Sequence, residues 1–171
     1  VRELLVRHHL SASTLRVEVL ERIAQIEHAQ EALEGLRDLG LGLYIDDFGT
    51  GYSSFSRLHR LPVTTLKIDR EFVRGMALGR GGDKVVKSII ALARSLELEV
   101  IAEGVSSAEE ASRLRDAGCR YMQGFYFSRA VSFDEAAEMV RDPRLFLAQY
   151  IQADQLRTTV SLEPGLLAAN T

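Results

Sequence analysis

The sequence is short of cysteine, of excess charge and of long apolar runs, and each shortage excludes a class of protein. Cys119 is the only cysteine among 171 residues, so no intramolecular disulfide can form, which fits a reducing compartment such as the cytoplasm. No apolar stretch is long enough to span a bilayer, and no signal peptide is present, so we expect no membrane insertion. The net charge of −3 gives no electrostatic reason to expect a nucleic-acid polymer as partner.

The remaining composition is that of an ordinary globular protein. Hydrophobic residues make up 46% of the chain and charged residues 26%, and the length predicts one domain. Cys119 directly precedes an apolar segment, so we expect it to be buried and inert. Because Val1 is not an initiator methionine, we expect the chain to be part of a longer protein.

Apolar segments of strand character alternate along the chain with segments of helical periodicity. The strands are predicted at residues 15–20, 43–45, 63–68, 99–102 and 121–127, the last interrupted by Gln123-Gly124. Helices are predicted at residues 24–39, 55–60, 83–96 and 107–117 and from Ser132 on, with capping boxes at Ser107/Glu110 and Ser132/Glu135. No fixed structure is assigned after residue 143. The alternation predicts an α/β fold, with a parallel sheet covered by helices.

The most informative stretch is LYIDDFGTGYSSF, residues 43–55. Its apolar beginning reads as a buried strand that ends in two adjacent carboxylates, Asp46 and Asp47. Adjacent carboxylates repel each other, but a divalent cation between or beside them makes the pair favourable. Gly49 and Gly51, with Thr50 between them, then allow the backbone to approach a ligand closely. An ordinary strand-to-turn junction is the alternative, because Asp and Gly are common turn residues.

Two better-known motifs do not account for this stretch. Asp47-Phe48-Gly49 matches the metal-binding triplet of protein kinases, but no catalytic-loop motif of the H-R-D type precedes it. The segment 49–51 is not a Walker loop, because no Gly-Lys-Ser/Thr follows it.

Polar side chains follow or end each of the five predicted strands. They are Glu21, Asp46 with Asp47, Lys67, Glu103 and Gln123. A (β/α)8 barrel gathers its active site from the carboxyl ends of many strands, whereas an open doubly wound sheet binds mainly at one switch point. The pattern therefore favours a TIM-type barrel. Such a barrel needs eight strands and roughly 200 to 250 residues, so roughly the first third is expected to be missing from this chain.

Taken as an ordered set, these segments closely resemble the EAL domain family, the cyclic-di-GMP phosphodiesterases of bacterial signalling. The segments are Glu18-Val19-Leu20-Glu21, the run 46–54, Leu61-Pro62, Leu66-Lys67-Ile68-Asp69, Ala102-Glu103-Gly104-Val105 and the run 123–128. The resemblance covers about residues 3–142. We therefore expect residues 1–142 to form the C-terminal portion of an EAL-like barrel and residues 143–171 to form a tail.

The resemblance also implies a role for each matching residue. Metal ligands are implied for Glu18, Asp46, Asp47 and Glu103; catalytic roles for Lys67, Glu103 and Glu21; and loop or substrate contacts for Gly49, Thr50, Gly51 and Gln123. Lys67 matches the lysine near the attacking water, and Glu21 the glutamate that steadies the loop after the aspartates. Taken singly, Lys67, Glu103 and Gln123 could instead be a solvated lysine, a turn residue and a satisfied polar group.

The implied activity is hydrolysis of cyclic-di-GMP to linear pGpG with Mg²⁺ or Mn²⁺. The Glu-Ala-Leu signature that names the family is absent, and so is an asparagine ligand of the following strand. Leu20, Ser106 and Ala130 also depart from the usual Thr, Glu and Pro. A truncated or degenerate module that binds the nucleotide or a protein without cleavage is therefore the alternative function.

The partners implied are cyclic-di-GMP and whatever completes the barrel. A barrel that lacks strands has exposed sheet edges, which favour pairing with another chain segment or a homodimer. In the family, dimers often form through the short helix after the double aspartate, here about residues 54–60. An upstream sensor or cyclase domain is expected in the parent protein.

Overall fold

A computed structural model describes residues 1–24, 26, 29–49, 58–77 and 81–142. The chain divides into two compact units, Val1–Arg129 and Ala130–Thr171. All the strands that the structure describes belong to the first unit, and helix α8 (Phe133–Arg141) belongs to the second. The predicted helix at 55–60 and the tail after residue 143 lie outside the described residues, apart from the last few positions of that helix.

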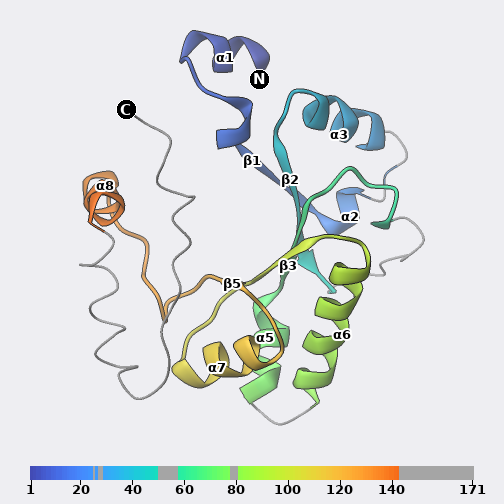
Figure 1. The fold of residues 1–171 in the computed structure, drawn as a ribbon, viewed down its shortest axis with the longest axis vertical. Coiled ribbons are helices and arrows are strands. Elements are labelled where there is room, and N and C mark those ends of the chain that lie inside the picture. The colour runs from blue at the N-terminus through green and yellow to red at the C-terminus, as the bar shows by residue number, and fades with distance from the viewer. Residues whose placement is uncertain (25, 27–28, 50–57, 78–80, 143–171) are drawn as a thin grey trace. The chain divides into compact units, whose positions relative to one another are not determined.

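The first unit is built on a five-stranded parallel sheet (Figure 1). Its strands are β1 (Arg16–Leu20), β2 (Gly42–Phe48), β3 (Thr65–Ile68), β4 (Glu99–Ala102) and β5 (Tyr121–Met122). Each strand pairs in parallel with the next strand along the chain, from β1 through to β5. A doubly wound sheet would reverse its strand order at a switch point, so the unbroken order confirms the predicted partial barrel.

Helices connect and cover these strands in the first unit. They are α1 (Arg2–Arg7), a 3-10 turn (Ala12–Thr14), α2 (Glu21–Ala24), α3 (Ala29–Asp38), α5 (Arg70–Ala77), α6 (Gly82–Ser95) and α7 (Ala108–Asp116). Figure 1 shows α5, α6 and α7 grouped together, with α6 against β3 and β4, while α2 and α3 lie against β2. Helices α6 and α7 begin and end within two residues of the predicted bounds, and α8 begins directly after the predicted cap, Ser132. The predicted helix 24–39 is α3 with the end of α2, and α5 was not predicted.

The predicted strand at 121–127 is wrong beyond its first two residues. The backbone turns at Gly124, which approaches the backbone of Val105 so closely that a side chain there would collide with it. Tyr126 then donates its N–H to the Val105 carbonyl, at 2.9 Å, and Phe127 donates to Gly124 at 3.0 Å. These hydrogen bonds replace a strand ladder, so residues 124–127 form a turn over the end of β4.

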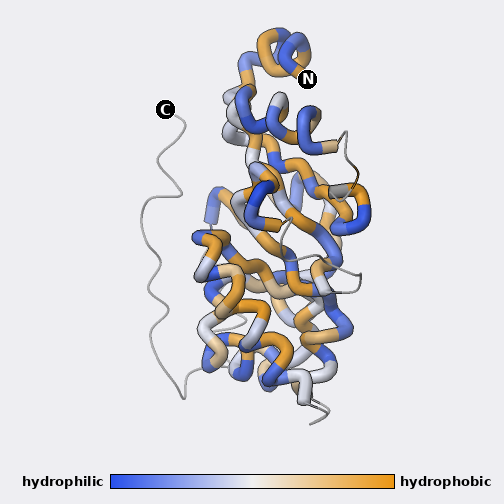
Figure 2. Tube along the Cα trace, turned by 90° about the vertical axis from the view of Figure 1, so that its right-hand side faces the viewer, coloured by the Kyte–Doolittle hydropathy of each residue, from blue (hydrophilic) through white to orange (hydrophobic). Residues whose placement is uncertain are grey.

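The hydrophobic core lies between one face of the sheet and the covering helices. Alternate strand residues, Leu43 and Ile45 of β2 and Leu66 and Ile68 of β3, are fully buried in it. Helices contribute one face each, and Figure 2 shows the resulting alternation of hydrophobic and hydrophilic stretches along them. Because side chains alternate across a strand, the opposite face of the sheet is left to the polar residues.

Both predicted capping boxes are present. Ser107 accepts the Glu110 N–H at the start of α7, and Ser132 accepts the Glu135 N–H at the start of α8. In each case the glutamate carboxylate accepts the N–H of the capping serine in return. Cys119 is buried, as predicted, and burial raises the pKa of its thiol, so the thiol is protonated and inert.

Candidate metal centre

The polar face of the sheet brings carboxylates from three strands around one lysine. Glu18 lies within β1, Asp46 within β2 and Lys67 within β3, and Glu103 directly follows β4. These strands are parallel neighbours, so their polar side chains meet at the same end of the sheet. The structure thus brings together four of the residues that the sequence singled out.

Lys67 is the centre of this group. Its Nζ atom lies 2.6 Å from Glu103 Oε1, 2.7 Å from Glu18 Oε1 and 3.1 Å from Asp46 Oδ1. The lysine side chain is only 5% exposed, so it is not the solvated strand-end lysine of the alternative reading. Burial alone would lower the pKa of Lys67, but the three carboxylates outweigh burial and raise the pKa above its usual value. Lys67 is therefore a charged, buried counter-ion.

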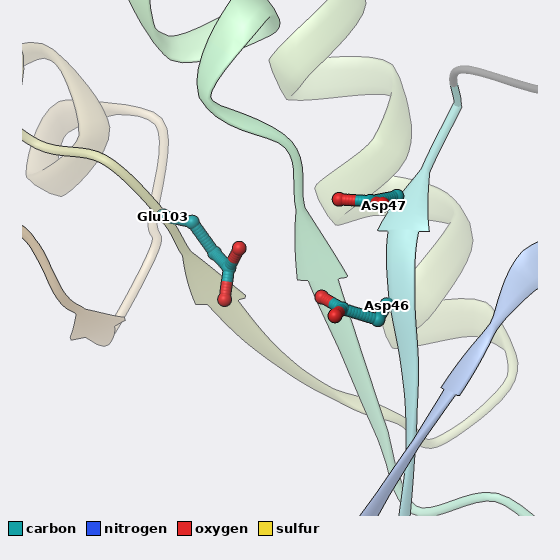
Figure 3. A group of neighbouring side chains, drawn as sticks. All are labelled: Asp46, Asp47 and Glu103. Atoms are coloured by element: carbon teal, nitrogen blue, oxygen red, sulfur yellow. The ribbon is translucent and has the colours of Figure 1, made fainter.

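A β-bulge lets Asp46 and Asp47 point to the same side. Ile45 pairs with Leu66 and Phe48 pairs with Ile68, so two residues of β2 oppose the single Lys67 of β3. Asp47 is the extra residue of the bulge, and its backbone has the left-handed conformation, at φ 53°. In a regular strand, neighbouring side chains face opposite ways. Here both aspartates project toward Glu103 across the end of β3 (Figure 3).

The carboxylates are close enough to disfavour their own ionisation. Burial raises the pKa of Asp47, and the neighbouring Asp46 and Asp69 raise it further. Burial also raises the pKa of Glu103, although Lys67 acts in the opposite direction. Asp69 is an addition to the predicted site: it accepts the Glu71 N–H at 2.7 Å, at the start of α5, while its charge acts on Asp47. Its place directly after the predicted strand at 63–68 was the available signal.

Two further contacts hold the edges of the site. Glu21 is buried at the start of α2, and its Oε2 accepts the backbone N–H of Gly49 at 2.8 Å. Gln123 follows β5 and donates from Nε2 to Glu103 Oε1 at 2.7 Å. These contacts agree in position with the roles that the resemblance implies, which remain predictions. Thr50 and Gly51 lie outside the described residues.

The donor set suits a hard divalent cation. Asp46, Asp47 and Glu103 each offer one carboxylate oxygen, and these atoms all lie within 4.8 Å of one another. Mg²⁺ and similar cations prefer such oxygen ligands. Asp46 Oδ1 is buried and, among the described residues, receives no well-aligned hydrogen bond despite its nearby ion-pair partner Lys67. A buried acceptor with spare coordinating capacity fits a metal ligand.

Comparison with known protein families decides what kind of domain carries this arrangement. The family model described as the EAL domain matches residues 1–130, which is most of the chain. The chain belongs to the EAL domain family. The membership confirms the family inferred from the sequence motifs, and it places the carboxylate group within the matched region.

Curated relatives of this EAL domain include proteins named for cyclic-di-GMP turnover. It is 40% identical over 143 residues to the cyclic di-GMP phosphodiesterase NbdA of Pseudomonas aeruginosa. That match covers 82% of this chain but 18% of NbdA, so the chain spans under a fifth of that relative.

Solved structures of EAL proteins share the fold. The PaMucR phosphodiesterase in complex with c-di-GMP is 40% identical, with a TM-score of 0.75 over 79% of this chain and 56% of that one. The Klebsiella pneumoniae BlrP1 manganese/cy-diGMP complex is 35% identical, with a TM-score of 0.68 over 74% of this chain and 33% of that one.

No helix among the described residues is both long and apolar enough to cross a bilayer.

Proposed function

We propose that this EAL domain takes part in the metal-dependent hydrolysis of cyclic-di-GMP to linear pGpG, with Mg²⁺ or Mn²⁺ as the metal. The observation that carries the proposal is the group of three carboxylates, whose oxygens lie within 4.8 Å of one another. The names of the relatives support the substrate, because NbdA is a cyclic di-GMP phosphodiesterase and PaMucR was solved with c-di-GMP. The BlrP1 complex contains manganese, which supports the choice of metal.

Each residue of the site has a part in this proposal. Asp46, Asp47 and Glu103 would hold the metal, joined by Glu18 on the neighbouring strand. When bound, divalent cations lower the pKa of water and neutralise charge on phosphoryl oxygens, which phosphodiester hydrolysis requires. Lys67 adds a fixed positive charge that can orient a water molecule and offset the charge of the reacting phosphate.

Residues at the margin keep these groups in place. Gln123 fixes one oxygen of Glu103 through its 2.7 Å hydrogen bond, so the remaining oxygen is left to face a metal. Glu21 fixes the backbone at Gly49, directly after the two aspartates. Gly49, Thr50 and Gly51 are the residues proposed to contact the substrate.

The rest of the barrel is proposed to come from outside this chain. Strand β1 pairs with β2 alone among the described strands, and Glu18 on β1 is 50% exposed. An upstream segment of the parent protein, carrying further strands and ligands, would cover that edge and that side chain. We propose residues 1–142 as the C-terminal portion of the barrel and residues 143–171 as a tail, in a cytoplasmic protein with an upstream sensor or cyclase domain.

Turnover tests the proposal directly. The protein is incubated with cyclic-di-GMP and Mg²⁺ or Mn²⁺, and pGpG is separated by anion-exchange chromatography. We expect metal-dependent pGpG from the wild type, none from Asp46→Asn, and wild-type rates from Asp116→Asn, an exposed aspartate at the end of α7. If the parent protein forms no pGpG at any metal concentration, the chain is not a hydrolase.

The second candidate function is binding without cleavage. It is favoured by the half-exposed Glu18, because no described strand pairs with the other side of β1. Calorimetry that detects cyclic-di-GMP binding by a protein that yields no pGpG would establish this function. A homodimer that completes the barrel is the associated assembly, and sedimentation as a stable monomer would exclude it.

A further inference from the structure

The ammonium group of Lys67 contacts the same carboxylates that are available to a metal ion. It lies 3.1 Å from Asp46 and 2.6 Å from Glu103, two of the three residues in the metal-binding group. We propose that Lys67 is a built-in competitor of the divalent cation, which lowers the affinity of the site for metal and holds the carboxylates in place when none is bound. This inference rests on the metal site of the proposed function.

Electrostatics makes this competition unavoidable. An ion held by Asp46 and Glu103 must come within a few ångströms of an ammonium that is already in contact with both of them. Like charges at that separation repel strongly where water is scarce. Lys67 and the ion also draw on the same carboxylates, whose lone pairs are limited in number.

Lys67 cannot withdraw from the site to relieve the repulsion. Its side chain is 5% exposed, and it stands on β3 between Leu66 and Ile68, both fully buried on the opposite face. Parallel pairing with β2 and β4 on either side fixes the backbone beneath it. The positive charge is therefore a permanent part of the site, present with and without metal.

The same lysine keeps the site assembled. Glu18, Asp46 and Glu103 would repel one another across the strand ends if no cation lay among them. Lys67 bridges all three, which holds them near one point. One ammonium among these carboxylates and Asp47 leaves the site negative, so a divalent cation is still attracted. The expected result is a preformed site with moderate rather than maximal metal affinity.

Manganese binding tests the proposal without any need for turnover. Binding of Mn²⁺ to the full chain is measured from the loss of the free-ion electron paramagnetic resonance signal. Lys67→Met, which removes the charge at similar length, should bind Mn²⁺ about tenfold more tightly or better. Lys67→Arg keeps the charge and should retain the weaker affinity, and Lys87→Met, an exposed lysine of α6, should match the wild type. Equal or weaker binding by Lys67→Met would overturn the proposal.

A second readout keeps the test valid if Lys67→Met is less stable. A ligand that binds the folded state raises the unfolding temperature, and at a fixed ligand concentration the rise is larger when binding is tighter. A fixed Mn²⁺ concentration should therefore raise the unfolding temperature of Lys67→Met more than that of the wild type, whatever the unfolding temperature without metal. An equal or smaller rise contradicts the competition. If the wild type and every variant fail to bind Mn²⁺, the proposed metal site is wrong, and so is the proposed competition by Lys67. Tighter Mn²⁺ binding by Lys67→Met, together with no turnover by the wild type, would refute hydrolysis and leave the competition by Lys67 standing.

Discussion

Replacing Gly49 by alanine probes the backbone at the exit from the two aspartates. Gly49 has φ +96°, in the region that residues with a side chain rarely adopt. An added Cβ would lie 2.8 Å from Cε2 and 3.0 Å from Cζ of Phe72, the ring that α5 presents to this turn. The N–H of Gly49 is also the group that Glu21 holds, so any shift of the backbone weakens that hydrogen bond.

Two costs set the size of the effect. A left-handed conformation costs a residue with a Cβ about 1–2 kcal/mol. Crowding against a packed side chain costs about 1–3 kcal/mol, with the lower end expected because the ring of Phe72 can rotate. We therefore expect Gly49→Ala to lower the free energy of unfolding by about 2–4 kcal/mol, a large part of the stability of a typical domain.

Urea unfolding followed by circular dichroism measures the change. Gly35→Ala is the matched control, because Gly35 lies inside α3 with no neighbour within 4 Å of the added Cβ, and it should stabilise by about 0.5–1 kcal/mol. Adding Phe72→Leu to Gly49→Ala should recover the crowding cost but not the backbone cost. If Gly49→Ala is as stable as the wild type, the described geometry of this turn is wrong.

Three further substitutions test other parts of the fold. Asp47→Asn should raise stability near neutral pH. Burial and Asp46 raise the pKa of Asp47 above 3.8, so the folded state loses stability as pH rises from that value through the raised pKa. Thermal unfolding between about pH 4 and pH 7 should show a smaller loss of stability in the variant. Ser107→Ala removes the cap of α7 and should cost about 1 kcal/mol in urea unfolding, with Ser107→Thr close to the wild type. Gly82→Ala would force a Cβ into the backbone of Gly75, so α6 must move away from α5. The free energy of unfolding should fall by about 1–3 kcal/mol. An unchanged midpoint of urea unfolding would contradict this close crossing of the two helices.

The grouping of the site could be predicted from the sequence because strand order alone determines it. Once Asp46, Lys67 and Glu103 are assigned to successive parallel strands, the fold rule brings them to one end of the sheet. The family motifs then added Glu18 and gave Glu21 its implied role. None of this required knowledge of side-chain geometry.

What the sequence did not reveal depends on backbone geometry and burial. Nothing in the pattern indicates the bulge at Asp46 and Asp47, since adjacent aspartates are equally consistent with a turn. The burial of Lys67 depends on neighbours from three strands, so a local reading favoured a solvated lysine. Helix α5 was missed although Phe72, Val73 and Met76 fall at helical spacing, because the segment has only eight residues and contains Gly75, which disfavours a helix; packing on α6 stabilises it.

We propose a divalent-cation site formed by carboxylates of neighbouring strands at the polar end of this sheet. Its most direct test is anomalous diffraction from crystals of the protein grown with Mn²⁺. The account predicts an anomalous peak about 2.1 Å from carboxylate oxygens of Asp46 and Asp47, with Glu103 turned toward it. A peak at other residues, or none while Lys67 keeps its three carboxylates, would contradict the account.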